Sequence, residues 1–380
     1  MPMHKRKLPY EIPCGTPLAM GRSPGFSLIE IMVGLAIGLA SMLAIYQLYA
    51  TSEGRRRTIV SISEAQTAGS MALFAIERDI RSAGLGFASI DARYLNCSVK
   101  AYNSGRSTAA FDFPLLPVRI ADGRIWVLTG SSSNMFAGAR YVGSSGGEFK
   151  MERSNAGFQA GDVILGTSDS FTDSCLLMEV TAGADPTSAT AAANKNKVHR
   201  KTGSYQDFYQ GKEVDATRND GAHISLLDSS KSSLGEGMLY SLGPEPTLTV
   251  WSVDDKKQLT RYNHLDETET DKVAVAHDIF QLQAEYGYDA NANGAIDEEV
   301  EWTASLSPNA TRWEQVLAVR IAVLMRIPHY EKDKVTNSAP RWANGTKQFS
   351  MGGGDEWMHY RYRVYESIVP LRNTLWGQQL

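Results

Sequence analysis

A run of twenty residues without a formal charge, from Ile31 to Ala50, sets the first limit on how this chain folds. Twenty helical residues extend about 30 Å, which matches the hydrocarbon core of a bilayer. The run is therefore predicted to be a transmembrane helix rather than a helix of a globular core. Glu30 stands at its start, and a carboxylate that reaches the bilayer centre costs roughly 2.5–3.5 kcal/mol on insertion scales. An acid at this position needs a partner.

The residues before this run predict a cleaved leader. Residues 1–25 hold four basic side chains and one acid, namely Lys5, Arg6, Lys7, Arg22 and Glu11. A secretory signal peptide has a small-residue cleavage site after its apolar region. Here the candidate cut, between Gly25 and Phe26, lies before the apolar run, so cleavage leaves the anchor on the mature chain.

Beyond the membrane span, the pattern becomes that of an amphipathic helix. A stripe with alternating spacings of three and four consists of Ile59, Ile62, Gln66, Gly69, Leu73, Ile76 and Ile80. Gly84 and Gly86 are natural helix stops. We therefore predict one helix over residues 26–84, with a transmembrane part at 26–50 and an amphipathic part at 51–84. A coiled coil is the alternative, and the weak positions Gln66 and Gly69 argue against it.

Residues 85–380 are predicted to form a β-rich head, which makes the fold class α+β with a long helix packed on the head. Short β-rich runs recur between Gly- and Ser-rich turns, at 124–130, 161–166, 175–181, 247–253, 279–288 and 316–327. Residues 182–236 are poor in apolar residues and are expected to be a long excursion of surface loops. Within them, the basic run at 194–201 is interpreted as a solvated face rather than a nucleic-acid contact.

The cysteine count fits an exported head. The chain has three cysteines, and Cys14 lies in the predicted leader. Cleavage would leave Cys97 and Cys175, an even pair available for a disulfide. A bond across their 78-residue separation would destabilise the unfolded chain by about 4 kcal/mol in the loop-entropy treatment. The alternative is two unrelated buried thiols.

One polar segment is a candidate calcium site. "YDANANGAIDEEVE" (288–301) matches the first half of an EF-hand loop, with oxygens expected at alternate positions. The candidate ligands are Asp289, Asn291, Asn293, the backbone carbonyl of Ala295, Asp297, and Glu299 or Glu301. The twelfth position, where a bidentate glutamate is required, is Val300. A polar Asn-Gly hairpin turn between two strands is the alternative.

The remaining residues predict neither an enzyme nor a nucleic-acid-binding protein. The formal charge of −4 and pI near 6.0 give no general attraction for nucleic acid. The seven histidines form no metal-binding pair, and no nucleophile-elbow, Walker or dinucleotide-binding motif occurs. We therefore expect no catalytic residues, and no cofactor apart from a possible Ca²⁺ at 289–301.

The segment "GFSLIEIMVGLAIG" (25–38) resembles the prepilin cleavage motif of type IV pilins. This resemblance implies that a prepilin peptidase cuts after Gly25 and methylates the new amino terminus at Phe26. It also implies that Glu30 neutralises the N-terminal amine of a neighbouring subunit during assembly.

Four further blocks are together similar to the PilW family of minor pilins. They are "AIERDIRSAGLGF" (75–87), "GDVILG" (161–166), "WEQVLAVRIAVLMR" (313–326) and "RYRVYESIVPLRN" (361–373). The resemblance implies a minor pilin that helps to prime or cap type IV pilus assembly. Its partners would be the prepilin peptidase, other minor and major pilins, the inner-membrane assembly platform and membrane lipid.

The expected location is the bacterial inner membrane, in a single pass with a cytoplasmic N-terminus and a periplasmic head, and also the pilus fibre or tip. The positive-inside bias contributes little to this orientation, since Arg55, Arg56 and Arg57 lie just beyond the span. Two other functions remain open. A minor pseudopilin of a type II secretion system shares the leader and helix, and a calcium-dependent adhesion module could stand at a pilus tip.

Overall fold

The computed structural model describes residues 25–132, 137–155, 157–169, 171–183, 195–224, 236–306 and 313–373. The predicted leader, apart from Gly25, lies outside them. The chain divides into two compact units, Met1–Ile59 and Val60–Leu380, which are described separately.

The first unit consists, in its described part, of the beginning of helix α1 (Leu28–Ser82). Two stretches of α1 are long and apolar enough to cross a membrane, Leu28–Ala50 and Ile59–Ser82. Every side chain from Leu28 to Ala50 is exposed, whereas the second stretch contributes buried residues to the core of the second unit. Of the two stretches, Leu28–Ala50 therefore fits the predicted membrane span.

In the second unit, α1 packs through a stripe of alanine and larger aliphatic residues. Ala65, Ala72, Ile76 and Ile80 are buried in the main core cluster, and Ile62 and Leu73 pack against them. The predicted stripe was wrong at Ile59, which is exposed, whereas Gln66, predicted as a weak position, is also exposed. Ala65 and Ala72, which the predicted stripe did not include, are buried, and their small side chains let the helix approach the strands closely.

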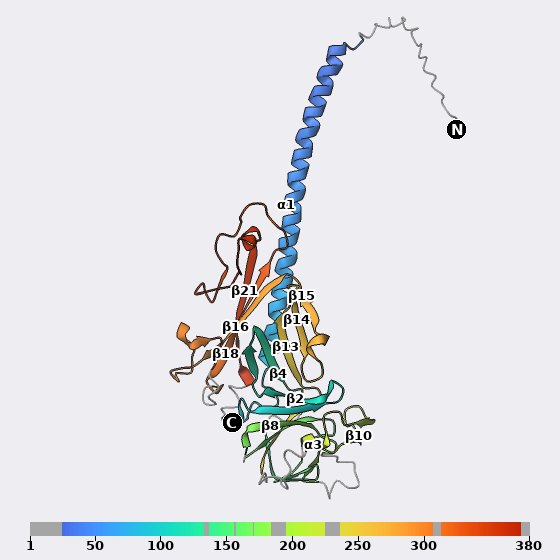
Figure 1. Cartoon of the computed structure of the whole chain (residues 1–380), viewed down its shortest axis with the longest axis vertical. Coiled ribbons are helices and arrows are strands. Elements are labelled where there is room, and N and C mark those ends of the chain that lie inside the picture. The colour runs from blue at the N-terminus through green and yellow to red at the C-terminus, as the bar shows by residue number, and fades with distance from the viewer. Residues whose placement is uncertain are drawn as a thin grey trace, which may run out of the picture. The chain divides into compact units, whose positions relative to one another are not determined.

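Two antiparallel sheets form the other side of this core. One has the order β15 (Val273–Ala276), β14 (Leu259–Asn263), β13 (Thr247–Val253), β4 (Arg124–Thr129) and β3 (Val118–Ala121). The other has the order β17 (Trp302–Thr303), β16 (Ile279–Tyr288), β18 (Val316–Arg326) and β21 (Tyr362–Pro370). Buried residues of both sheets join α1 in one cluster. In Figure 1, β13–β15 and β16, β18 and β21 lie on opposite sides of this part of α1.

The longest strand, β18, is buried on both faces. Val319, Ile321 and Val323 face the cluster that contains α1. Ala322 and Leu324 face a second cluster beneath the segment that holds β19 (Arg341–Trp342) and β20 (Lys347–Gln348). The strand therefore forms the centre of its sheet.

An eight-stranded sheet makes up the rest of the head. Its order is β2 (Ser107–Pro114), β1 (Ser98–Asn103), β8 (Phe171–Glu179), β7 (Val163–Ser168), β12 (Gly237–Gly243), β5 (Ala139–Ser145), β6 (Glu148–Met151) and β9 (Lys197–His199). The β1–β8 pair is parallel, and the other pairs are antiparallel. Its core clusters contain no residue of α1.

The expected loop excursion at 182–236 contains more structure than predicted. Its described parts hold β9, the hairpin of β10 (Ser204–Gln206) and β11 (Glu213–Asp215), and the short helix α3 (Gly221–Ile224). The buried residues here are largely polar, including Arg200, Arg218 and Asn219. A hydrophobicity pattern could not show them, because they are held by hydrogen bonds rather than by apolar packing.

Candidate assembly surface

The predicted processing residues, Gly25 and Phe26, directly precede α1, and the predicted assembly residue Glu30 lies in its first turn. The carboxylate of Glu30 accepts a hydrogen bond from the backbone N–H of Ser27 at 3.4 Å. An acid in a first helical turn also interacts favourably with the helix dipole. The side chain has no cationic partner among the described residues. Phe26 is 83% exposed, so a new amino terminus at this residue would be accessible to another subunit.

Gly69 is a site of close helix–strand approach. A Cβ placed on it would lie 2.7 Å from Cδ2 and 2.8 Å from Cζ of Tyr365 on β21. These separations are well inside van der Waals contact. The glycine that seemed to weaken the stripe is therefore what allows the Tyr365 ring to lie against α1.

Two polar contacts hold the end of α1 on the head. Asp79 accepts a hydrogen bond from the indole Nε1 of Trp251 on β13 at 3.0 Å. Burial raises the pKa of Asp79, although the Trp251 hydrogen bond and the nearby Arg78 oppose the rise. Asn373, just beyond β21, donates its amide to the carbonyls of Ser82 and Ala83 at 3.3 and 3.0 Å. Both contacts satisfy groups that would otherwise be buried without partners.

The opposite face of this part of α1 carries three exposed apolar side chains, with the exposed polar residues Ser63, Glu64 and Thr67 between the first two. Val60, Met71 and Phe74 are 47%, 66% and 66% exposed, and helical periodicity places them together on one face. We call these three residues the outer stripe. Exposed apolar groups on a helix that is already packed on its other face are typical of a surface for a further helix.

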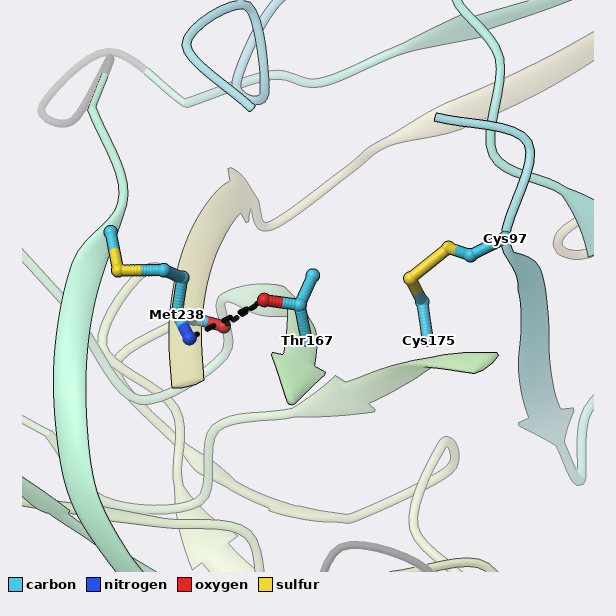
Figure 2. Close-up of a disulfide and its surroundings, with 4 residues drawn as sticks. All are labelled: Cys97, Thr167, Cys175 and Met238. Carbon is cyan, nitrogen blue, oxygen red and sulfur yellow. Dashed lines mark hydrogen bonds between the residues drawn. A yellow bond between two sulfur atoms is a disulfide. The ribbon is translucent and has the colours of Figure 1, made fainter. Parts of the chain in front are cut away.

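The predicted disulfide is present in the head. Cys97 and Cys175 are bonded, with their Cα atoms 5.9 Å apart (Figure 2). Cys97 directly precedes β1 and Cys175 lies on β8, so the bond reinforces the parallel pairing of these strands. Nearby, the backbone N–H of Met238 donates to the Thr167 hydroxyl at 3.3 Å, which links β12 to β7.

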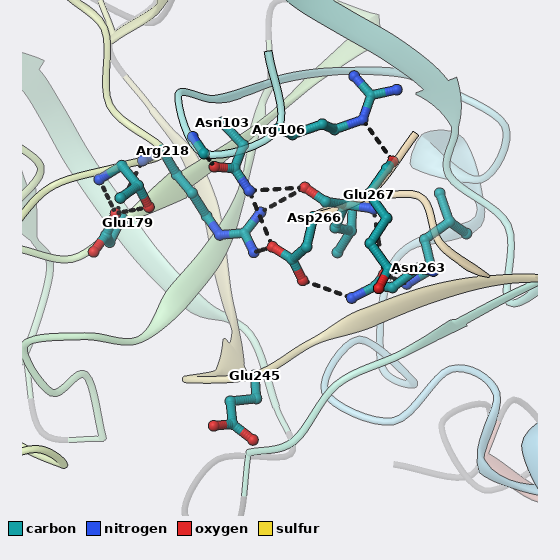
Figure 3. A network of polar contacts seen from close by, with 12 residues as sticks. Asn103, Arg106, Glu179, Arg218, Glu245, Asn263, Asp266 and Glu267 are labelled. Atoms are coloured by element: carbon teal, nitrogen blue, oxygen red, sulfur yellow. Dashed lines mark hydrogen bonds and ion pairs between the residues drawn. The ribbon is translucent and has the colours of Figure 1, made fainter. Parts of the chain in front are cut away.

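A buried polar network joins the eight-stranded sheet to the five-stranded sheet. Arg218 is paired with Asp266, and Asn103 donates to the same carboxylate at 3.0 Å (Figure 3). On the other side, the backbone N–H of Arg218 donates to Glu179 at 3.0 Å. Asp266, the first acid of the segment 266–271, therefore has a structural role. Through Arg218, the network also fixes part of the expected loop excursion at 182–236.

Burial also shifts the titration of a histidine. His264 lies within 6.0 Å of the ring centroids of Phe111, Trp126 and Tyr262. Burial, with smaller contributions from two arginines nearby, lowers the pKa of His264 to about 4. The imidazole is thus neutral at physiological pH and packs as an aromatic group.

The candidate calcium loop is organised by its own backbone. Asp289 accepts hydrogen bonds from the N–H groups of Asn293 and Gly294 at 3.0 and 2.7 Å, with Gly294 at φ +81°. Glu301 accepts from the N–H groups of Asp297 and Glu298 at 2.8 and 3.1 Å.

The other predicted oxygens of this loop have separate roles. Asn291 accepts the Asn293 N–H at 3.0 Å, whereas Ala295 donates its N–H to the Asn293 amide oxygen at 2.9 Å. Glu299 is paired with Arg320 at 2.8 Å, outside the loop. In the described part of the chain, no group of three or more His, Cys, Asp or Glu side chains could hold a metal ion. Calcium binding at 289–301 stays a prediction.

Sequence reasoning did not predict which head residues contact α1. Tyr365, Trp251 and Asn373 come from strands or strand ends far from the helix in sequence, so no local pattern pairs them with it. Gly69 was the only local signal, since a glycine inside a helical stripe indicates either a weak position or a close approach.

A helix with an acid in its first turn and an apolar stretch is followed by a β-rich head, an arrangement consistent with the α+β fold expected of a pilin-like subunit. Two family profiles match the chain: the prokaryotic N-terminal methylation motif over residues 20–46, and type IV pilus-assembly protein W (PilW) over residues 247–373. Together these two matches support a PilW-like type IV pilin. No curated protein and no solved structure matches. The families found are not known enzymes.

Proposed function

We propose that this chain is a minor pilin that takes part in the assembly of a type IV pilus. The observation that carries the proposal is the combination of the methylation motif at the start of α1 with the PilW match at the end of the head. The chain's role is structural, as an anchored subunit that is extracted from the membrane into a growing fibre. A minor pseudopilin of a secretion system is not favoured by these matches.

The mechanism starts from the cost of burying Glu30. After cleavage behind Gly25, the acid lies four residues from a new amine at Phe26. In a fibre, the membrane span leaves the lipid and packs among other helices, where an unpaired carboxylate is expensive. Pairing of Glu30 with the amine of a neighbouring subunit offsets that cost and fixes the axial register of the two helices. The outer stripe extends the same helix–helix contact beyond the membrane span.

The partners and the location follow from this role. We propose the prepilin peptidase, other pilins and the inner-membrane assembly platform as partners, with the N-terminus in the cytoplasm and the head in the periplasm. The disulfide supports the periplasmic head, because such bonds persist in oxidising compartments. Under the same proposal, the subunit either primes the fibre or remains at its tip.

Deletion of the gene tests the function. We expect loss of surface pili, counted by electron microscopy, with protein secretion intact. Complementation with the wild-type gene should restore pili and Glu30→Gln should not, although its processing and membrane level are unchanged. Glu213→Gln changes an exposed acid of the head, away from α1, and should restore pili fully. Lost secretion with normal piliation would contradict the proposal.

A further inference from the structure

The basic run at 194–201 forms one edge of the eight-stranded sheet. Its β9 pairs with β6, so that Lys197 lies directly opposite Lys150. The backbone pairing continues past the strand, where the carbonyl of Lys195 accepts the N–H of Asn155 at 3.1 Å. We call Lys150, Lys195, Lys197 and Lys201 the lysine strip. Lys150, Lys195 and Lys201 are exposed, and the side chain of Lys197 is 41% exposed.

The strip places like charges together at a cost to the fold. Two lysines directly opposite each other on an antiparallel pair destabilise it. Glu148 on β6 balances only part of this charge, because it is shared by Lys197 at 3.0 Å, Lys201 at 3.2 Å and the ring of His199 at 3.2 Å. Although burial tends to raise the pKa of Glu148, the lysine hydrogen bonds outweigh it and lower that pKa.

Lys150 and Lys195 form no ion pair with any residue that the structure describes. The four lysines, set against Glu148 and the adjacent Glu152, leave a local formal charge of +2 on a chain whose total is −4. A positive strip on an acidic protein, kept in spite of an unfavourable cross-strand pair, indicates a negatively charged ligand.

The shape of the strip restricts that ligand. It is two strands wide, or about 5 Å between strands, and same-face side chains recur about every 6.5–7 Å along each strand. The major groove of a duplex is wide enough for two strands, but duplex binding relies on several phosphate contacts spread over a basic surface, and only Lys150 and Lys195 of the strip lack an ion pair among the described residues. Single-stranded nucleic acids are held by stacking on aromatic rings. None of the exposed aromatic side chains in the described ranges lies on β5, β6 or β9. The strip therefore fits a flexible chain with regularly spaced charges and no bases.

We propose that the lysine strip binds a flexible anionic polysaccharide. Lys150 and Lys195 supply charge that no protein group neutralises. Lys197 and Lys201 are held in place by Glu148 and can contact the ligand with their remaining donors. This inference does not depend on the pilus function, because it rests on the head alone.

Binding of fluorescent dextran sulfate to the full chain in detergent micelles tests the proposal, with neutral dextran as the ligand control. We expect Lys150→Gln/Lys195→Gln to weaken binding about tenfold near 0.1 M salt and to reduce the slope of log affinity against log salt by about two. The matched variant Lys256→Gln/Lys332→Gln changes two exposed lysines elsewhere on the head and should bind as the wild type does. Thermal unfolding should be unchanged in the matched variant, and the melting temperature of Lys150→Gln/Lys195→Gln should be no lower than that of the wild type, because this variant loses the unfavourable cross-strand pair.

Two results would overturn the proposal. One is equal binding by Lys150→Gln/Lys195→Gln and the wild type, which would place the contact elsewhere. The other is tighter binding of a 20-base single strand or a 20-base-pair duplex than of dextran sulfate at matched charge, which would make the strip a nucleic-acid surface.

Discussion

The contact between Gly69 and Tyr365 gives the sharpest prediction about how α1 is held on the head. Gly69→Ala removes a flexible residue from a helix interior, which by itself stabilises a helix by about 1 kcal/mol. The new methyl group would, however, lie less than 3 Å from ring carbons of Tyr365. Overpacking of this kind costs about 1–3 kcal/mol. The difference between these two effects is a net loss of up to about 2 kcal/mol in the free energy of unfolding.

A double-mutant cycle separates the two effects. In a Tyr365→Ala background the ring is absent, so Gly69→Ala should stabilise the chain by about 1 kcal/mol. The coupling between the two sites then equals the overpacking cost of about 1–3 kcal/mol. Urea unfolding of the full chain in detergent, followed by tryptophan fluorescence, measures the free energy of unfolding of each variant. The dependence of this free energy on urea concentration should be the same in all variants.

The same helix offers a control for this cycle. A Cβ placed on Gly38 would meet no other group within 4 Å, so Gly38→Ala should leave the unfolding of the head unchanged. If Gly69→Ala stabilises the chain equally with and without the Tyr365 ring, the close packing of α1 on β21 is refuted.

Three further predictions concern the head. Cys97→Ser/Cys175→Ser should lower the free energy of unfolding by up to about 4 kcal/mol, and dithiothreitol should lower that of the wild type equally; a variant as stable as the oxidised protein would contradict this. The pKa of His264 is about 4 in the folded chain and about 6.5 in the unfolded chain. Below pH 6.5 the unfolded chain therefore binds a proton that the folded chain does not, and the free energy of unfolding falls by up to about 3 kcal/mol towards pH 4. His264→Phe should flatten a chemical-denaturation profile over that window, and an unchanged slope would show that other groups cause it. Asp289→Asn should lower the melting temperature in the absence of calcium, since the carboxylate accepts two backbone N–H groups. If millimolar CaCl₂ raises the melting temperature of the wild type but not that of the variant, the loop binds calcium. Equal shifts in the two proteins would exclude calcium binding by this loop.

Some of the fold could be predicted because its signals are local. The runs at 247–253 and 279–288 coincide with β13 and β16, since β-branched and aromatic residues between turn residues specify a strand wherever it lies in a sheet. The long helix and the cysteine pair were predicted for similar reasons. The helix needs only periodicity, and two cysteines in an exported head have few other partners.

The rest of the fold depends on contacts between residues that lie far apart in the sequence. Ala65 and Ala72 are core residues of α1, yet alanine carries too little hydrophobicity to mark a stripe. Arg218 is buried because Asp266 and Leu265 lie beside it, and nothing near it in sequence shows that. The same limit holds for the assembly surface: the motif at Glu30 is local, whereas the strands that receive α1 are not.

Mass spectrometry of the mature amino terminus tests the central claim most directly. The full chain would be isolated from membranes of cells that contain a prepilin peptidase, and its N-terminal peptide sequenced. We predict a chain that begins at Phe26 with one methyl group on its amine and lacks residues 1–25. A chain that begins at Met1, or at a site after the apolar span, would contradict the assignment as a processed pilin.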